Sequence, residues 1–250
     1  MNAHDSEPAV VLVINCGSSS IKYQLLVMPE GMFLAGGLLE RIGQPDSSLR
    51  HRVRDENGEL QEDRQVVAAT DHYEALRRIN EAMRTSGALA DGRVPTAIGH
   101  RVVHGGESFC APTIIDSSVI GSIRALSSLA PLHNPANLIG IMVCRETFPD
   151  VPQVAVFDTA FHQTMPPWAY RYAIPEEWYV RHGVRRYGFH GTSHQYVATR
   201  TADYVSRPLA ELHLITLHLG NGASAAAIKN GRCIDTSMGF TPLDGLVMGA

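Results

Sequence analysis

Two distant stretches of the sequence share one arrangement: an apolar strand, a tight turn of small residues and a second strand. The first, VINCGSSSI, covers 13–21, and the second, LHLGNGAS, covers 217–224. Backbone N–H groups and hydroxyls in such turns can converge on an anion. Either turn alone could be a simple connection between strands. Together they predict a duplicated fold in which each half binds a phosphate.

Composition excludes several classes of protein. The 250 residues are 44% hydrophobic and 18% charged, and 21 basic against 25 acidic side chains give a net charge of −4. We therefore expect a globular protein that binds no nucleic acid. The apolar run 9–14 is too short to span a membrane, and acidic residues precede it where a secretory signal would be basic. The four cysteines are scattered without a CxxC pair, which favours free thiols and a cytoplasmic protein.

Strand and helix patterns alternate along the chain, which predicts a mixed α/β fold. The polar stretch 43–66 is expected to be an edge hairpin or a surface excursion. Residues 162–188 read as irregular, with one short helix near Glu176. Strands are expected at 10–16, 21–25, 32–41, 96–104, 153–157, 212–219, 223–229 and 232–237. Helices are expected at 71–85, 117–129, from Asn134 onward, and at 192–206.

Helix signals are strongest at two places. Over 71–85 one face carries Tyr73, Leu76, Ile79 and Met83, and Asp71 with Glu74 resembles a capping box. Asn134 followed by Pro135 predicts a second helix start, with the asparagine as N-cap.

Three polar positions could carry chemistry, each with an ordinary structural alternative. Arg101 lies in an apolar strand before Gly105-Gly106, where it could bind a carboxylate or form an ion pair with Glu107 or another acid. His133 precedes a helix start, so it could face an anion or bond to local backbone. Asp158 ends a buried strand, where it could hold Mg²⁺ or cap a helix.

The densest group of such residues is YGFHGTSH, residues 187–194. His190 and His194 have the spacing of a helical zinc pair, but no HExxH glutamate accompanies them. A histidine-rich metal hydrolase therefore remains a rival hypothesis, while an anion-facing His190 at a helix N-terminus fits the pattern better.

Seven segments together resemble the acetate kinases. The resemblance runs from Val11 to Gly249 and is carried by VLVINCGSSSIKYQLL, GHRVVHGGE, LAPLHNPAN, VFDTAFHQTMP, RYGFHGTSH, LHLGNGAS and DTSMGFTPLDGLVMG. It implies the actin-like, ribonuclease H-like duplicated α/β fold with mixed sheets of the acetate and sugar kinases. Residues 1–150 would form the first actin-like domain with the first phosphate hairpin. Residues 151–250 would begin a second, truncated domain with the second phosphate hairpin.

The resemblance also implies roles for individual residues. Asn15 would lie near Mg²⁺ or Mn²⁺, Asp158 would be the catalytic aspartate, and Arg101 would bind the substrate carboxylate. The histidines near the transferring phosphoryl group would be His133 and His190. Phosphate-binding residues would be Ser18, Ser20, Lys22, His218, Leu219, Gly220, Asn221 and Gly222. The pocket for the substrate methyl group would be formed by Val103, Leu132, Phe189 and Pro242.

The expected activity is reversible phosphoryl transfer from ATP to acetate, giving acetyl phosphate and ADP. Propionate or butyrate could replace acetate, since a methylene is worth only about 1–3 kcal/mol in such a pocket. The sequence ends at Ala250, where the family continues into a second catalytic arginine, the adenosine-binding segments and much of a homodimer surface. We therefore expect slow turnover from the 250-residue chain, because losing one such arginine can cost about 10³–10⁵ in rate. A remnant that only binds nucleotide is the remaining alternative.

Overall fold

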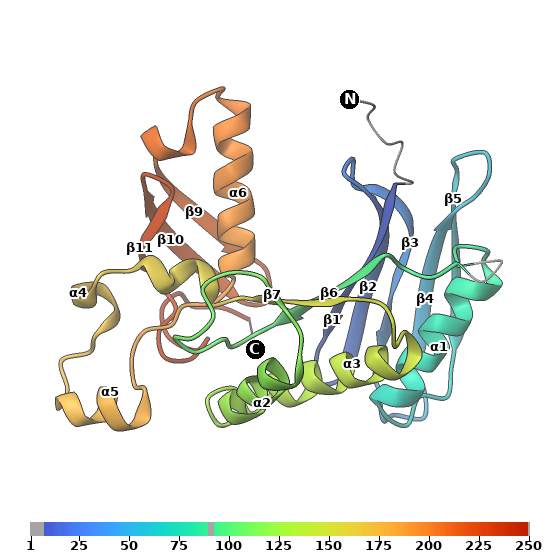
Figure 1. Cartoon of the computed structure of the whole chain (residues 1–250), viewed down its shortest axis with the longest axis horizontal. Helices are drawn as coiled ribbons and strands as arrows, with labels where there is room; N and C mark the ends of the chain where they lie inside the picture. The colour runs from blue at the N-terminus through green and yellow to red at the C-terminus, as the bar shows by residue number, and fades with distance from the viewer. Residues whose placement is uncertain (1–7, 90–92, 250) are drawn as a thin grey trace. The chain divides into compact units, whose positions relative to one another are not determined.

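The computed structural model describes residues 8–89 and 93–249 and falls into two compact units (Figure 1). Unit 1 contains Met1–Val102, Thr113–Ser127 and Pro131–Ala155. Unit 2 contains Val103–Pro112, Ser128–Ala130 and Val156–Ala250. Two short segments from the first 150 residues therefore pack within unit 2. The assignment of 1–150 and 151–250 to two actin-like domains stays a prediction.

Unit 1 is built on a mixed sheet, as expected for the α/β class. The sheet has eight strands in the order β5-β4-β3-β2-β1-β6-β8-β7. β1 pairs antiparallel with β2 and parallel with β6. The edge hairpin predicted within 43–66 is confirmed as β4 and β5. The strands are β1 (Ala9–Cys16), β2 (Ser20–Met28), β3 (Met32–Glu40), β4 (Ser48–Arg54), β5 (Leu60–Val66), β6 (Ala97–Val102), β7 (Thr113–Ile114) and β8 (Gln153–Phe157).

Strict alternation in β2 gives this sheet one buried and one open face. Ile21, Tyr23 and Leu25 are buried while Lys22 and Gln24 are exposed, as a period of two requires. Helices α1 (His72–Thr85) and α3 (Asn134–Thr147) cover the buried face (Figure 1). α2 (Ser117–Ala125) packs beside α3 and ends in a short 3-10 turn, η1 (Leu126–Ser128).

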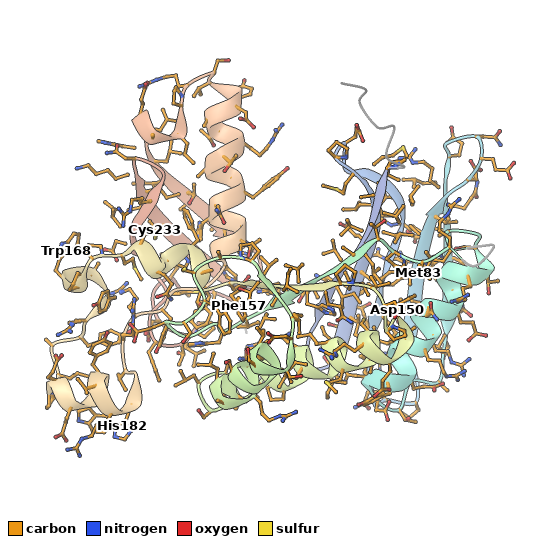
Figure 2. All side chains as sticks on the ribbon, in the orientation of Figure 1. Met83, Asp150, Phe157, Trp168, His182 and Cys233 are labelled. Carbon is orange, nitrogen blue, oxygen red and sulfur yellow. The ribbon has the colours of Figure 1, made fainter. Side chains whose placement is uncertain are left out.

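The helix signals are confirmed with two corrections. Asp71 caps α1 by accepting from the Glu74 N–H at 2.9 Å, and Met83 lies in the core (Figure 2). Tyr73 is 47% exposed, because it falls at the flank of the buried face rather than on it. α3 begins one residue early, with His133 as N-cap. Asn134 cannot take that place because it is already helical and fully buried.

Unit 2 combines a small antiparallel sheet with an irregular segment. The sheet order is β11-β10-β9, and Asn230 and Gly231 turn with positive φ values of 54° and 78°, as a two-residue hairpin demands. α6 packs against β9. Trp168, which Figure 2 labels on α4, is 74% exposed according to its surface area. The elements are η2 (Ala160–Thr164), α4 (Pro167–Tyr170), α5 (Glu176–His182), α6 (Gly191–Tyr204), η3 (Leu209–Glu211), β9 (His213–Leu219), β10 (Ala223–Lys229) and β11 (Arg232–Thr236).

Over residues 8–89 and 93–249, no helix combines the length and the apolar character needed to cross a bilayer.

Candidate functional site

The end of β8 brings a buried carboxylate to the start of α6. Asp158 follows the strand directly and is 2% exposed. Its backbone oxygen accepts from the Gly191 N–H at 2.8 Å, and its Oδ1 accepts from the Thr192 hydroxyl at 3.4 Å. A Cβ at Gly191 would lie 2.3 Å from that backbone oxygen. Only glycine therefore permits this approach, which seats the carboxylate at the positive end of a helix.

His190 is fixed in place immediately before the same helix. Its backbone is left-handed, with φ 58°, and it forms the N-cap of α6. Its Nδ1 lies 2.9 Å from Ser224 Oγ, and its ring stacks on His218 with centroids 3.9 Å apart. A Cβ on Gly222 would approach the His190 ring to 3.1 Å. The second glycine-rich turn thus leaves room for this imidazole.

Behind His190 lies a chain of buried polar side chains. His194 Nε2 lies 2.9 Å from Ser224 Oγ, and His194 Nδ1 lies 2.8 Å from Thr216 Oγ1. Burial, assisted by His162, His190 and His218, lowers the pKa of His194 to about 4. His194 is therefore neutral near pH 7 and carries a single N–H.

This neutrality couples the hydrogen positions along the chain. If Thr216 donates to His194 Nδ1, then His194 Nε2–H donates to Ser224. The Ser224 hydroxyl then donates to His190 Nδ1, which leaves the His190 proton on Nε2. The reverse direction places the proton of a neutral His190 on Nδ1. Ser224 is the residue through which His194 and Thr216 set the donor atom of His190.

Replacing Ser224 by alanine is expected to disturb both histidines. The change removes a hydroxyl that serves His190 Nδ1 and the buried His194 Nε2, so the free energy of unfolding should fall by about 1–3 kcal/mol. The ¹⁵N imidazole resonances of His190 and His194 should shift as their tautomers redistribute. In Ser237→Ala, which removes a hydroxyl bonded to the Ala225 N–H, both imidazole spectra should stay as in the wild type. Unchanged spectra in Ser224→Ala would contradict the coupling.

His162 supports the same region from η2. Its Nε2 lies 2.9 Å from the Phe189 backbone oxygen, and its Nδ1 lies 3.1 Å from Cys233 Sγ. Burial lowers its pKa to about 4, so the ring stays neutral. A Cβ on Gly188 would meet this ring at 2.9 Å. His162 and Gly188 together hold the backbone that leads into His190.

Two of the expected methyl-pocket residues lie together in unit 2. Val103 and Phe189 pack in one buried cluster with Met238, and Met248 lies against it. Pro242 is half-buried and is not part of this cluster. Leu132 belongs to unit 1 and is 72% exposed.

The first glycine-serine turn lies in unit 1, and side chains from two helices bond to its backbone. Gly17 N–H donates to the Ser20 backbone oxygen at 2.8 Å, and Ser18 is exposed. His72 Nε2 contacts the Gly17 oxygen at 2.7 Å. Asn137 Nδ2 donates to the Cys16 oxygen at 2.7 Å. Helices α1 and α3 therefore both hold the turn through side chains.

The first turn adjoins two other expected site residues. Lys22 pairs opposite Asn15 in the β1–β2 register. Arg101 NH1 donates to Asn15 Oδ1 at 3.2 Å. The side chains of Arg101, Asn15 and Lys22 therefore come from neighbouring positions of the unit 1 sheet. Glu107, weighed above as a partner for Arg101, is ion-paired with Arg185 and accepts from the Tyr179 hydroxyl at 3.0 Å.

The remaining predicted residues lie at the start of α3 and at the end of β9 with the turn that follows it. His133 is the half-buried N-cap of α3, without a side-chain capping bond. His218 Nδ1 lies 2.9 Å from Ser193 Oγ, which ties β9 to α6. Leu219, Gly220 and Asn221 are exposed, and the Gly220 N–H donates to the Gly222 oxygen at 3.0 Å.

Metal ligands are sparse in the described part of the chain. It contains no group of three or more histidine, cysteine, aspartate or glutamate side chains arranged to hold a metal. The two histidines of the rival zinc hypothesis both contact one hydroxyl, because Ser224 Oγ lies 2.9 Å from His190 Nδ1 and 2.9 Å from His194 Nε2. Asp158 offers hard carboxylate oxygens that suit Mg²⁺. Asn15 suits it less well, since its Oδ1 already accepts from Arg101.

Sequence reasoning missed the supporting residues. The sequence patterns do not predict roles for Thr192, Thr216 and Ser224, and they indicate His194 only as a zinc ligand. Two signals pointed to them: the His-x₃-His spacing of 190–194, and the serine that follows the second glycine turn.

Comparisons with known proteins agree on one family. Residues 10–250 match the Acetokinase family. An acetate kinase of Thermoanaerobacter pseudethanolicus is 55% identical over 242 residues, covering 96% of this chain and 59% of the relative. An acetate kinase of Thermotoga maritima is 54% identical over 241 residues with the same coverage.

Solved structures give the same result. The acetate kinase of Porphyromonas gingivalis superposes with a TM-score of 0.84 at 45% identity. A propionate kinase of Francisella tularensis superposes with a TM-score of 0.88 at 41% identity. Each alignment covers 96% of this chain and 60% of the solved chain. The chain thus spans about three fifths of the length of these proteins.

Proposed function

Because this chain belongs to the acetokinase family, we propose that it serves phosphoryl transfer from ATP to acetate, giving acetyl phosphate and ADP. The observation that carries the proposal is the convergence of Asp158, His190 and the start of α6 in unit 2. A buried carboxylate and an oriented imidazole at a helix N-terminus suit the binding of a phosphate group and its metal.

The proposed reaction needs no general base. A carboxylate oxygen attacks the γ-phosphorus, and the bond between that phosphorus and the bridging oxygen of ADP breaks. Acetate is already ionised near pH 7, since carboxylic acids titrate near pH 4. Catalysis then consists of positioning and of neutralising charge on the phosphoryl oxygens.

The proposal gives the following roles to the residues that bind acetate and phosphate. Arg101 binds the acetate carboxylate through its guanidinium, while Val103 and Phe189 contact the methyl group. His190 donates from Nε2 to an oxygen of the transferring phosphoryl group, in the direction that Ser224 allows. His133, Ser18, Ser20, Lys22 and the 218–222 turn bind phosphate oxygens.

Mg²⁺ would bind with Asp158, directly or through water, and would neutralise charge on the nucleotide phosphates. Under this proposal Asp158 would position the Mg²⁺ and would not transfer a proton. Homodimer formation and a cytoplasmic location accompany the proposal as further expectations from the family resemblance.

Propionate is the second candidate substrate. The Francisella tularensis neighbour named a propionate kinase favours it, and one extra methylene changes binding by only about 1–3 kcal/mol. Comparing kcat/KM for acetate and propionate would rank the two substrates.

An Asp158→Asn variant tests the role of the carboxylate. Acyl phosphate is trapped with hydroxylamine and measured as the hydroxamate over a range of Mg²⁺ concentrations. We expect turnover to fall about 10–100-fold and the Mg²⁺ requirement to rise. The matched control is Asp203→Asn, since Asp203 pairs with Arg200 on the surface of α6, and it should behave as wild type. Near-normal turnover of Asp158→Asn at saturating Mg²⁺ would contradict the role.

A further inference from the structure

The open face of the unit 1 sheet contains a hollow bordered by basic side chains. It measures about 400 Å³ and is lined by Lys22 of β2 and by Arg50 and Arg52 of β4, with Asn15 and Gln24 among the other residues. It lies opposite the face that α1 and α3 cover, because Lys22 and Gln24 alternate with the buried Tyr23. We call it the basic hollow.

The strand register explains its shape. Lys22 pairs with Leu38, which pairs with Arg50, and Gln24 pairs with Gly36, which pairs with Arg52. Gly36 contributes no side chain, and a Cβ there would meet the Phe33 ring at 2.9 Å. The Phe33 ring therefore occupies the space over Gly36, between Gln24 and Arg52, and Lys22, Arg50 and Arg52 line the hollow.

The positive charge of the basic hollow is not balanced. Among the described residues, Lys22, Arg50 and Arg52 take part in no ion pair. The acid opposite Arg52 is Glu62 on β5, and its Oε1 accepts from Arg64 Nε at 2.9 Å. The Arg64 guanidinium, followed by Arg50 and Arg52, holds the pKa of Glu62 below its usual range. Glu62 therefore lies near Arg50 and Arg52 without pairing with either, and it is itself held by Arg64.

Arg52 supplies a donor that the described residues leave unsatisfied. Its Nε is buried and has no hydrogen-bond acceptor in the described part of the chain. Its guanidinium lies 5.7 Å from the centroid of the Phe33 ring, which restrains it. A buried N–H without an acceptor is costly, and an arginine fork matches phosphate oxygens in a bidentate way.

We propose that the basic hollow binds an oxyanion of the polyphosphate class, with at least two phosphate groups. Lys22 and Arg50 stand two strands apart, about 10 Å, and Arg50 and Arg52 stand two residues apart, about 7 Å. A ligand with phosphates in series can engage this spread of cations, whereas a single phosphate can engage only part of it. The site shares Lys22 with the phosphate-binding residues proposed above, whereas Arg50 and Arg52 are not among the residues proposed for acyl transfer.

Calorimetric titration of the 250-residue chain with inorganic tripolyphosphate tests the site without any measurement of activity. We expect saturable one-to-one binding that weakens with added salt. The affinity should fall about tenfold or more in Arg50→Gln and in Arg52→Gln, and further in the double variant. Inorganic monophosphate should bind at least about tenfold more weakly than tripolyphosphate.

The control is Arg77→Gln, which makes the same charge change on α1 and removes an exposed ion pair with Glu74. Its affinity for tripolyphosphate should equal that of the wild type. Non-saturable binding by the wild type, or equal affinity in the wild type and Arg50→Gln, would overturn the proposal. Because the Arg52 Nε is buried, Arg52→Gln and the double variant can lose stability; the affinity of Arg50→Gln alone then tests the proposal. If the wild-type protein binds tripolyphosphate but forms no acyl phosphate, the result contradicts the proposed function and still supports the binding site proposed here.

Discussion

Replacing His190 by alanine is expected to lower kcat for acetyl phosphate formation by about 10²–10³-fold, with a smaller change in the KM for acetate. Removing one preorganised donor to a developing oxyanion has an effect of this size. His190 meets the requirement of preorganisation, since its backbone, its Nδ1 contact with Ser224 and its stacking on His218 all fix the ring. Hydroxamate formation at saturating ATP and Mg²⁺ measures the effect.

The control for this prediction is an exposed histidine. His182, at the end of α5, is exposed, and His182→Ala should keep wild-type kcat. A His190→Gln variant retains a side-chain donor and should recover part of the loss. A kcat in His190→Ala within about twofold of the wild type would exclude His190 from contact with the phosphoryl group.

Acidification is expected to destabilise the folded chain steeply between pH 6.5 and pH 4. Burial lowers the pKa of four histidines to about 4, so the folded state keeps them neutral while the unfolded state protonates them below about 6.5. The unfolded state then binds more protons, and the stability gained from these rings is lost as the pH falls through this window. Each ring contributes a slope of about 1.4 kcal/mol per pH unit. The four are His100, His104, His162 and His194.

His100→Gln isolates one of these contributions. His100 Nε2 lies 2.8 Å from Gln153 Oε1 within unit 1, and glutamine removes the titrating group while keeping a polar side chain. Urea unfolding at a series of pH values should give a slope lower by about 1.4 kcal/mol per pH unit between pH 6.5 and 4. Between pH 7 and 8 the slopes of the wild type and the variant should coincide. Equal slopes below pH 6.5 would show that His100 takes up its proton in the folded state as readily as in the unfolded one.

Local features of the fold could be predicted because their causes lie within a few residues. The alternation in β2, the Asp71 cap of α1, the Asn230-Gly231 turn and the end of β8 at Asp158 are all signals of short range. The start of α3 was misplaced by one residue for the opposite reason. Whether Asn134 caps the helix or enters the core depends on packing partners from elsewhere in the chain.

The residues of the candidate site also fall into two groups, those that the sequence predicts and those that only the structure shows. Asp158, His190 and the second glycine turn could be singled out from residue type and from the family resemblance. The partners of His190 could not, because Ser224 is 34 residues away and its contact depends on how the sheet of β9 and β10 packs against α6 through β9. Arg50 and Arg52 lie in the polar stretch 43–66, where the sequence predicts no binding site. Their convergence with Lys22 became visible only through the β2–β3–β4 register.

The function proposed for this sequence is phosphoryl transfer from ATP to a small carboxylate. The most direct test follows ³¹P resonances while the gene product, at its native length, is incubated with MgATP and acetate. We predict that the γ-phosphate signal of ATP declines as an acetyl phosphate signal grows, only when acetate is present. Loss of ATP without acetate, or no acetyl phosphate from the folded protein, would contradict the account.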